Sequence, residues 1–119
     1  MKILNVDDSE FMRTILKDLL KNIAPEAEVL EASNGNEALE QYKTNKPDLM
    51  LLDLIMPEKD GMEVLKEIGT ETGKKIVVVS SVGQEETIEE AKKLGADAYV
   101  VKPFEENALA QTVKELMGL

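Results

Sequence analysis

The chain of 119 residues contains no cysteine, no histidine and no tryptophan. The absence of cysteine excludes a disulfide framework and any metal site built on thiolates. The absence of histidine leaves no side chain that ordinarily titrates near pH 7, and it excludes catalysis by a histidine base. Carboxylates, hydroxyls and lysines are therefore the groups left for chemistry.

Long apolar runs are missing too, because no segment approaches the roughly 18 residues of a membrane span and the N-terminus has no signal-peptide core. Basic residues are few: 14 Lys and Arg stand against 24 Asp and Glu, a formal charge of -10. This balance argues against nucleic-acid binding, which needs a basic face, and allows a basic protein partner. The length suits one domain, and we expect a cytoplasmic protein that does not bind membranes.

Apolar segments of strand length alternate with five amphipathic helical segments along the chain. The expected strands are Lys2–Asp7, Ala27–Ala32, Asp48–Asp53, Lys75–Ser80 and Ala98–Val101. Strict alternation of this kind predicts an α/β protein whose parallel sheet is covered by helices on both faces. The first helical stripe runs from Phe11 to Ile23, and we expect its apolar residues, Phe11 included, to face the sheet.

Polar side chains follow four of these strands directly. Asp7 and Asp8 end the first strand, Asp53 the third, Ser80 the fourth and Lys102 the fifth. Since the carboxyl ends of parallel strands share one edge of the sheet, these residues are expected to converge. Clustered carboxylates raise one another's pKa, and a hard divalent cation such as Mg²⁺ relieves the repulsion. Together the groups suit phosphoryl transfer to a carboxylate nucleophile.

Each of these residues, taken singly, also has an ordinary structural explanation. Asp7 or Asp8 stands where a helix N-cap is expected, and Asp53 is an ordinary loop acid. Lys102 alone would be a solvated lysine, and Ser80 alone is uninformative. Only their expected convergence at one edge favours a functional site over these explanations.

Six short motifs in this chain match the motifs of one known family. They are Val6–Ser9, Leu52–Asp53, Met56–Pro57, Asp60–Gly61, Ser80–Ser81 and Val101–Phe104. On these residues the whole chain resembles the receiver domain of two-component response regulators, and Asp8–Arg13 resembles the opening of the stand-alone chemotaxis regulators. The resemblance implies a flavodoxin-like doubly wound fold with five helices and a five-stranded parallel sheet in the order 2-1-3-4-5 known for this family. We expect one receiver domain over residues 1–119 and no output domain.

The resemblance also implies what the site residues do. Asp53 accepts a phosphoryl group from the phosphohistidine of a sensor histidine kinase (CheA-like). Asp8, Asp53 and the backbone carbonyl of Ile55 ligate Mg²⁺, and Asp7 does so through water. Lys102 pairs with the phosphoryl group and precedes Pro103 through a cis peptide bond.

The resemblance also implies roles for four positions in the conformational switch and in the lifetime of the phosphorylated form. Ser80 hydrogen-bonds the phosphoryl group and moves toward it, and Tyr99, otherwise a packing residue, swings into the space vacated. Ile55 and Val82 stand two residues after Asp53 and Ser80, where family members often carry polar side chains that influence hydrolysis. Because both are apolar here, we expect slow autodephosphorylation.

Output partners of the family bind the surface formed by the fourth helix, the fifth strand and the fifth helix. The corresponding residues in this chain are Glu85, Glu86, Ile88, Glu89, Tyr99 and Thr112. The glutamates are explained equally by an ordinary solvated helix face. If they bind a partner, their charge favours a basic adaptor, as in archaeal chemotaxis, over the motor switch protein of bacterial flagella. We expect the protein to be a monomer.

The sequence fits other functions less well. A phosphatase of the haloacid-dehalogenase type needs a second acid two residues after its nucleophile, where this chain has Ile55, so we expect no enzymatic turnover of a separate substrate. A flavin-binding module would place a Ser/Thr-rich loop where Asp7 and Asp8 stand. A single-domain phosphorelay intermediate, or the receiver part of another response regulator, remains the alternative.

Overall fold

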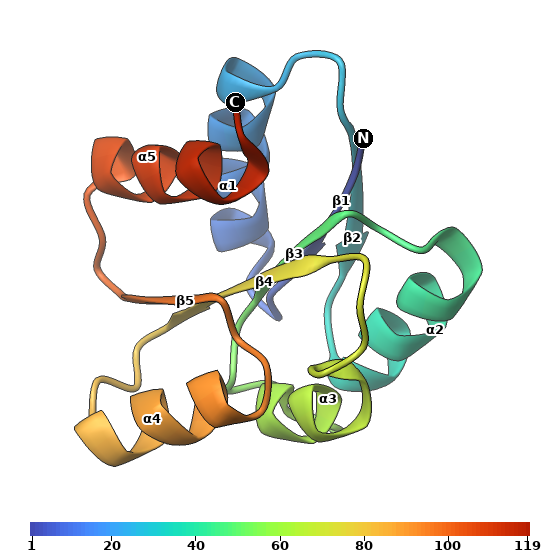
Figure 1. Ribbon diagram of the computed structural model, residues 1–119, viewed down its shortest axis with the longest axis vertical. Helices are drawn as coiled ribbons and strands as arrows, with labels where there is room; N and C mark the ends of the chain where they lie inside the picture. The colour runs from blue at the N-terminus through green and yellow to red at the C-terminus, as the bar shows by residue number, and fades with distance from the viewer.

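The computed structural model describes all residues from Met1 to Leu119 and contains one five-stranded parallel sheet (Figure 1). The strands run in the order β2-β1-β3-β4-β5. Their bounds are β1 (Lys2–Val6), β2 (Glu28–Ala32), β3 (Leu49–Leu52), β4 (Lys75–Ser80) and β5 (Ala98–Val101). Every pairing is parallel. The predicted fold class and strand order are confirmed, and the helices between the strands are the crossovers that parallel pairing requires.

Five helices cover the two faces of the sheet. They are α1 (Glu10–Ile23), α2 (Gly35–Asn45), α3 (Gly61–Ile68), α4 (Glu85–Lys93) and α5 (Glu106–Met117). One face packs against α1 and α5, and the other against α2, α3 and α4 (Figure 1). Side chains of β3 alternate between the two cores, with Met50 and Leu52 on one side and Leu49 and Leu51 on the other. None of the helices is both long enough and apolar enough to cross a membrane.

The connections reverse direction between β1 and β3, which are neighbours in the sheet although β2 lies between them in the chain. From β1 the chain crosses to β2 on one side, and from β2 it returns to β3 on the other. Helices on opposite faces leave a crevice at such a point, beyond the carboxyl ends of the two strands. The residues after β1 and β3 are therefore the ones that the fold places in this crevice.

One prediction about α1 is wrong. Phe11 does not join the apolar stripe, because 75% of it is exposed, whereas Leu16, Leu19 and Leu20 are buried. With 3.6 residues to a turn, Phe11 lies about 140° around the helix from Leu16, on the side facing away from the sheet.

Candidate functional site

Three acids meet where β1 and β3 end. Asp7 and Asp8 follow β1, and Asp53 follows β3, whose last residue Leu52 pairs in register with Val6. One carboxylate oxygen from each acid lies within 4.8 Å of those of the other two. Asp7 and Asp53 are only 1% and 6% exposed, while Asp8 faces solvent. The result is a carboxylate cluster with two buried members and one open side.

Lys102 completes the cluster from the end of β5. Its Nζ lies 2.7 Å from Asp7 Oδ2 and 3.4 Å from Asp53 Oδ2. The Lys102–Pro103 peptide bond is cis, as the family resemblance implies. In this structure the ammonium group bridges two carboxylates, and it lies where it could also reach a phosphoryl group held at Asp53.

Burial raises the pKa of the Asp53 carboxyl group above its ordinary value. The Lys102 ammonium and the Ile55 N–H, which donates to Oδ1 of Asp53 at 3.3 Å, lower it, and the charge of Asp7 raises it further. Mutual repulsion of the acids, the cause expected from the sequence, contributes less to the raised pKa of Asp53 than desolvation does. Asp53 follows a strand buried on both faces, so the position that brings it to the site also removes it from water.

The donors present suit a hard divalent cation. Carboxylate oxygens are the ligands that Mg²⁺ prefers, and Mg²⁺ is held by a few of them together with water and phosphate oxygens. One lysine cannot balance three carboxylates, so the cluster keeps an excess of negative charge that a divalent cation would neutralise. Its exposed side, at Asp8, leaves room for water or a phosphoryl group.

Ser80 and Tyr99 are joined through the backbone of Val82. Ser80 is fully buried, and its Oγ accepts a hydrogen bond from the Val82 N–H at 3.2 Å. The Tyr99 hydroxyl donates to the Val82 carbonyl, and burial raises the pKa of this phenol. Ile55, two residues after Asp53, is in contrast 59% exposed. The roles assigned to these four residues remain predictions.

Arg13 contacts the backbone of the site, a role that the sequence alone does not predict. Its guanidinium donates to the Asp7 carbonyl at 2.7 Å and pairs with Glu31 of β2 at 2.9 Å, and its own carbonyl accepts from the buried Asn5 side chain at 3.0 Å. Arg13 therefore fastens α1 to the end of β1. The sequence shows a basic residue one turn after the N-cap Ser9, but it carries no signal for a backbone carbonyl partner.

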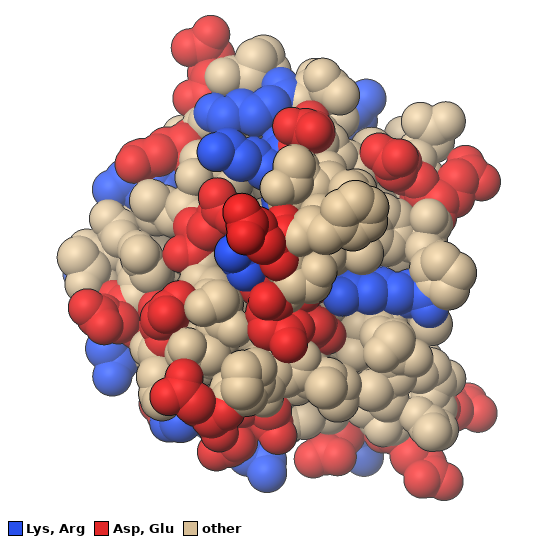
Figure 2. All heavy atoms as spheres, turned by 180° about the vertical axis from the view of Figure 1, so that it is seen from behind, with Lys and Arg blue, Asp and Glu red and all other residues tan.

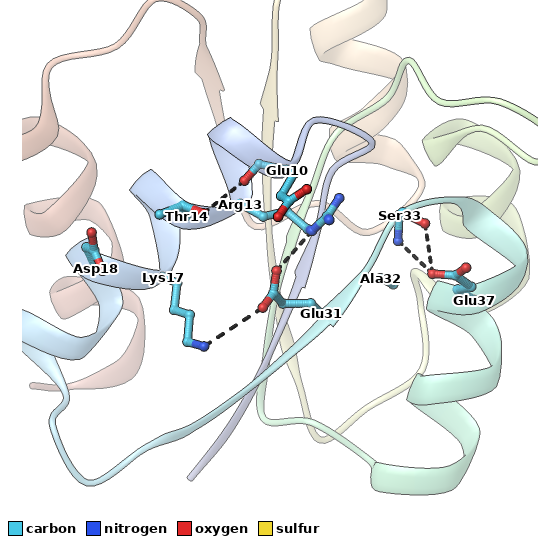
Figure 3. Close-up of a pocket in the computed structure, with 9 residues that line it drawn as sticks. All are labelled: Glu10, Arg13, Thr14, Lys17, Asp18, Glu31, Ala32, Ser33 and Glu37. Atoms are coloured by element: carbon cyan, nitrogen blue, oxygen red, sulfur yellow. Dashed lines mark hydrogen bonds and ion pairs between the residues drawn. The ribbon is translucent and has the colours of Figure 1, made fainter.

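A charged pocket of about 600 Å³ lies beside Arg13, between α1, β2 and the start of α2 (Figure 3). Figure 3 shows Arg13 and Lys17 reaching Glu31 from α1, and Ser33 facing Glu37. None of the three clustered acids lines this pocket. This pocket is thus a neighbour of the carboxylate cluster and separate from it.

The charged residues of the predicted partner surface are exposed to solvent. Glu85, Glu86 and Glu89 face solvent on α4 and, with Gln84, line a shallow depression of about 450 Å³. The other predicted members, Ile88, Tyr99 and Thr112, are half-buried. Figure 2 shows acidic side chains spread over the face seen from behind, in keeping with the net charge of -10.

A parallel α/β fold with a carboxylate cluster and a lysine at its switch point defines a class of protein, and comparison with known proteins identifies it. The model of the response regulator receiver domain matches residues 3–114. The chain therefore belongs to the response regulator receiver family.

Relatives and solved structures agree with this assignment. The chain is 41% identical to the chemotaxis protein CheY of Halobacterium salinarum, over 98% of this chain and 96% of the relative. It is 40% identical to CheY of Thermotoga maritima, over 97% and 96% of the two chains. A crystal structure of a CheX-CheY-BeF3-Mg complex from Borrelia burgdorferi superposes with a TM-score of 0.90 at 26% identity, covering 98% of this chain and 89% of that one.

Proposed function

We propose that the chain is a phosphorylation-regulated switch of chemotaxis signalling and that Asp53 is its phosphoacceptor. The observation that carries the proposal is the cluster of Asp7, Asp8 and Asp53 with Lys102 at the switch point of a receiver fold. The relatives named as chemotaxis proteins favour this function over a phosphorelay intermediate or a receiver belonging to another regulator.

In the proposed reaction an Asp53 carboxylate oxygen attacks the phosphorus of a phosphohistidine on a sensor histidine kinase. The oxygen–phosphorus bond forms as the bond from phosphorus to the histidine nitrogen breaks, and the imidazole leaves. Lys102, 3.4 Å from the Asp53 carboxylate, holds a phosphoryl oxygen once the group arrives. Mg²⁺, held by Asp8, Asp53 and the Ile55 carbonyl, and by Asp7 through water, would supply neutralisation of phosphoryl charge. The Borrelia CheX-CheY complex contains magnesium together with BeF3, which supports the choice of metal.

The switch is proposed to pass through Val82. When Ser80 turns its hydroxyl to the phosphoryl group, it gives up the hydrogen bond from the Val82 N–H. The β4–α4 connection can then shift, and Tyr99, bound to the Val82 carbonyl, shifts with it into the space that Ser80 leaves. The added charge biases an equilibrium between two arrangements.

Incubation of the purified protein with a small-molecule phosphodonor and Mg²⁺ tests this function. Intact-mass analysis should show an adduct of one phosphoryl group, and peptide mapping should place it on Asp53. Complete absence of an adduct at every donor concentration, with the protein folded, would contradict the proposal.

The phosphorylated form is expected to decay slowly. Ile55 and Val82 carry no polar group that could orient a water molecule for attack on the phosphoryl group. Ile55→Asn and Val82→Glu should each accelerate decay, on the order of tenfold for a single positioned polar group. Decay is followed by loss of the mass adduct after the donor is removed. Rates equal to the unsubstituted protein in both variants would refute this explanation.

The output partner is proposed to be a basic adaptor protein that binds the exposed glutamates of α4. Identity to the Halobacterium and Thermotoga relatives is nearly equal, at 41% and 40%, so this proposal depends on the charge of the helix. Glu86→Lys with Glu89→Lys should abolish capture of the partner by the phosphorylated protein in a pull-down, while Glu40→Lys on α2 should leave it intact. Capture of a flagellar switch protein alone would overturn the proposal.

A further inference from the structure

The loop from Asp53 to Asp60 carries both the proposed phosphoacceptor and the Ile55 carbonyl. Its two ends are in direct contact, because the Gly61 N–H donates to the Leu54 carbonyl at 3.0 Å. A Cβ atom at Gly61 would lie 2.3 Å from the Asp53 carbonyl oxygen, closer than real Cβ contacts. The loop is therefore closed on itself at a point where only glycine fits.

A second contact reaches the loop from α2. The Gly35 N–H donates to the Lys59 carbonyl at 2.8 Å, and a Cβ atom at Gly35 would lie 2.2 Å from that oxygen. Gly35 is the first residue of α2 and its backbone is not in the left-handed region. Glycine is thus needed here because the two backbones approach closely. The backbone conformation of Gly35 itself does not require glycine.

The start of α2 is itself held in place, so Gly35 has a defined position. Asn34 caps the helix by accepting from the Glu37 N–H at 2.9 Å, and Glu37 accepts from the N–H and hydroxyl of Ser33, both at 2.9 Å (Figure 3). These bonds lower the pKa of Glu37. One residue earlier, the Ala32 carbonyl accepts from the Asp7 N–H at 3.1 Å. The residues that flank the β2–α2 turn, Ala32 and Gly35, therefore contact the backbone of Asp7 and the backbone of the loop that follows Asp53.

Beyond Met56, little else fixes the loop. Leu54 and Met56 are buried in the core, but Pro57 and Glu58 are exposed. The Ile55 side chain is 59% exposed, so it contributes little packing. The Lys59–Glu67 ion pair lies at the surface, where such pairs contribute little to stability. The buried side chains of Leu54 and Met56 therefore hold the first half of the loop, and the backbone contacts made by Gly35 and Gly61 hold its second half.

We infer that Gly35, on a helix that contributes no residue to the carboxylate cluster, is a positioning residue for the site: its contact with the Lys59 carbonyl fixes the second half of the loop whose first half presents Asp53 and Ile55. The inference rests on the proposed function for its meaning. Groups that orient ligands without touching the ion typically change metal affinity by 10–100-fold when they are lost. A Cβ atom at Gly35 would displace Lys59 and so shift the loop between Asp53 and Gly61.

Gly35→Ala tests the inference, with Asn36→Ala as its matched control. Both substitutions add a better helix former to the first turn of α2, but Asn36 is exposed. Gly35→Ala should raise the dissociation constant for Mg²⁺, measured by titration calorimetry on the unphosphorylated protein, on the order of tenfold. Asn36→Ala should leave it unchanged.

A metal-free readout separates positioning from loss of stability. In protein without Mg²⁺, amide hydrogen exchange at Gly61 should accelerate in Gly35→Ala and not in Asn36→Ala. If Gly35→Ala does not fold, Asn34→Ala, which loosens the start of α2 without adding a clash, should show a smaller change in the same direction. Unchanged Mg²⁺ affinity and Gly61 exchange in the folded variants would overturn the inference. Failure of the unsubstituted protein to bind Mg²⁺ would overturn the proposed function along with it.

Discussion

Asp53→Asn is expected to abolish the phosphoryl adduct completely. The amide has nearly the shape of the carboxylate but is not a nucleophile toward phosphorus at neutral pH, so the substitution removes the reaction and keeps the shape of the site. Intact-mass analysis after incubation with a small phosphodonor and Mg²⁺ measures the effect directly.

Asp60→Asn is the matched control for this experiment. Asp60 lies in the same loop, but it caps α3 through the Glu63 N–H at 2.9 Å and is not one of the clustered acids. This variant should keep the adduct in full, with at most a small loss of stability because asparagine also caps helices. An undiminished adduct in Asp53→Asn, mapped to another residue, would contradict the assignment of the phosphoacceptor.

The Asp53→Asn variant should also be more stable than the unsubstituted protein at neutral pH without Mg²⁺. Because burial raises the pKa of Asp53, the folded state binds a proton at the Asp53 carboxyl group more tightly than the unfolded chain does. The protein therefore loses stability as the pH rises from the ordinary value of 3.8 through the raised pKa, and asparagine avoids that loss. Urea titrations should show the advantage of Asp53→Asn above this range and its disappearance below it. An advantage independent of pH would contradict the account.

The sequence predicts most of the fold because each of its signals is local. Apolar segments such as Leu49–Leu52 read as buried strands, and alternation with helices makes the sheet parallel. Parallel strands share one carboxyl edge, so convergence of Asp7, Asp53 and Lys102 follows from topology without any knowledge of distances. The error at Phe11 arose because its hydrophobic character was counted while its angular position on α1 was not.

The contacts that the sequence could not predict are those whose partner is a backbone carbonyl. Arg13 donates to the Asp7 carbonyl and Gly35 to the Lys59 carbonyl. Because every residue has a backbone carbonyl, the sequence does not indicate which one is bound. The pairing of Lys102 with Asp7, rather than with Asp53 alone, is similar, since it depends on which of two buried carboxylates lies nearer. The composition of the site can be inferred from sequence, but its internal bonding requires coordinates.

Lys102→Met is expected to destabilise the protein by about 3 kcal/mol at neutral pH in the absence of Mg²⁺. Methionine keeps most of the apolar stem and removes the ammonium group, so Asp7, 1% exposed, loses its partner at 2.7 Å. Removing one member of a buried ion pair typically costs about 3–5 kcal/mol, because an uncompensated charge stays behind. Denaturant unfolding of Lys102→Met should show this loss, and Lys75→Met, at an exposed lysine without an ion pair, should show almost none.

Added Mg²⁺ should restore part of the stability of Lys102→Met, since a divalent cation at the cluster replaces the missing positive charge and binds the folded state alone. A loss below about 1 kcal/mol, the value of a surface pair, would mean that water already compensates the carboxylates. The double variant with Asp53→Asn then separates the two partners of the lysine. If Asp53 at 3.4 Å takes a real share of the charge, Lys102→Met should cost less in the asparagine background than in the unsubstituted protein. Equal losses in both backgrounds would assign the pairing energy to Asp7, leaving the Asp53 carboxylate energetically independent of Lys102 before phosphorylation.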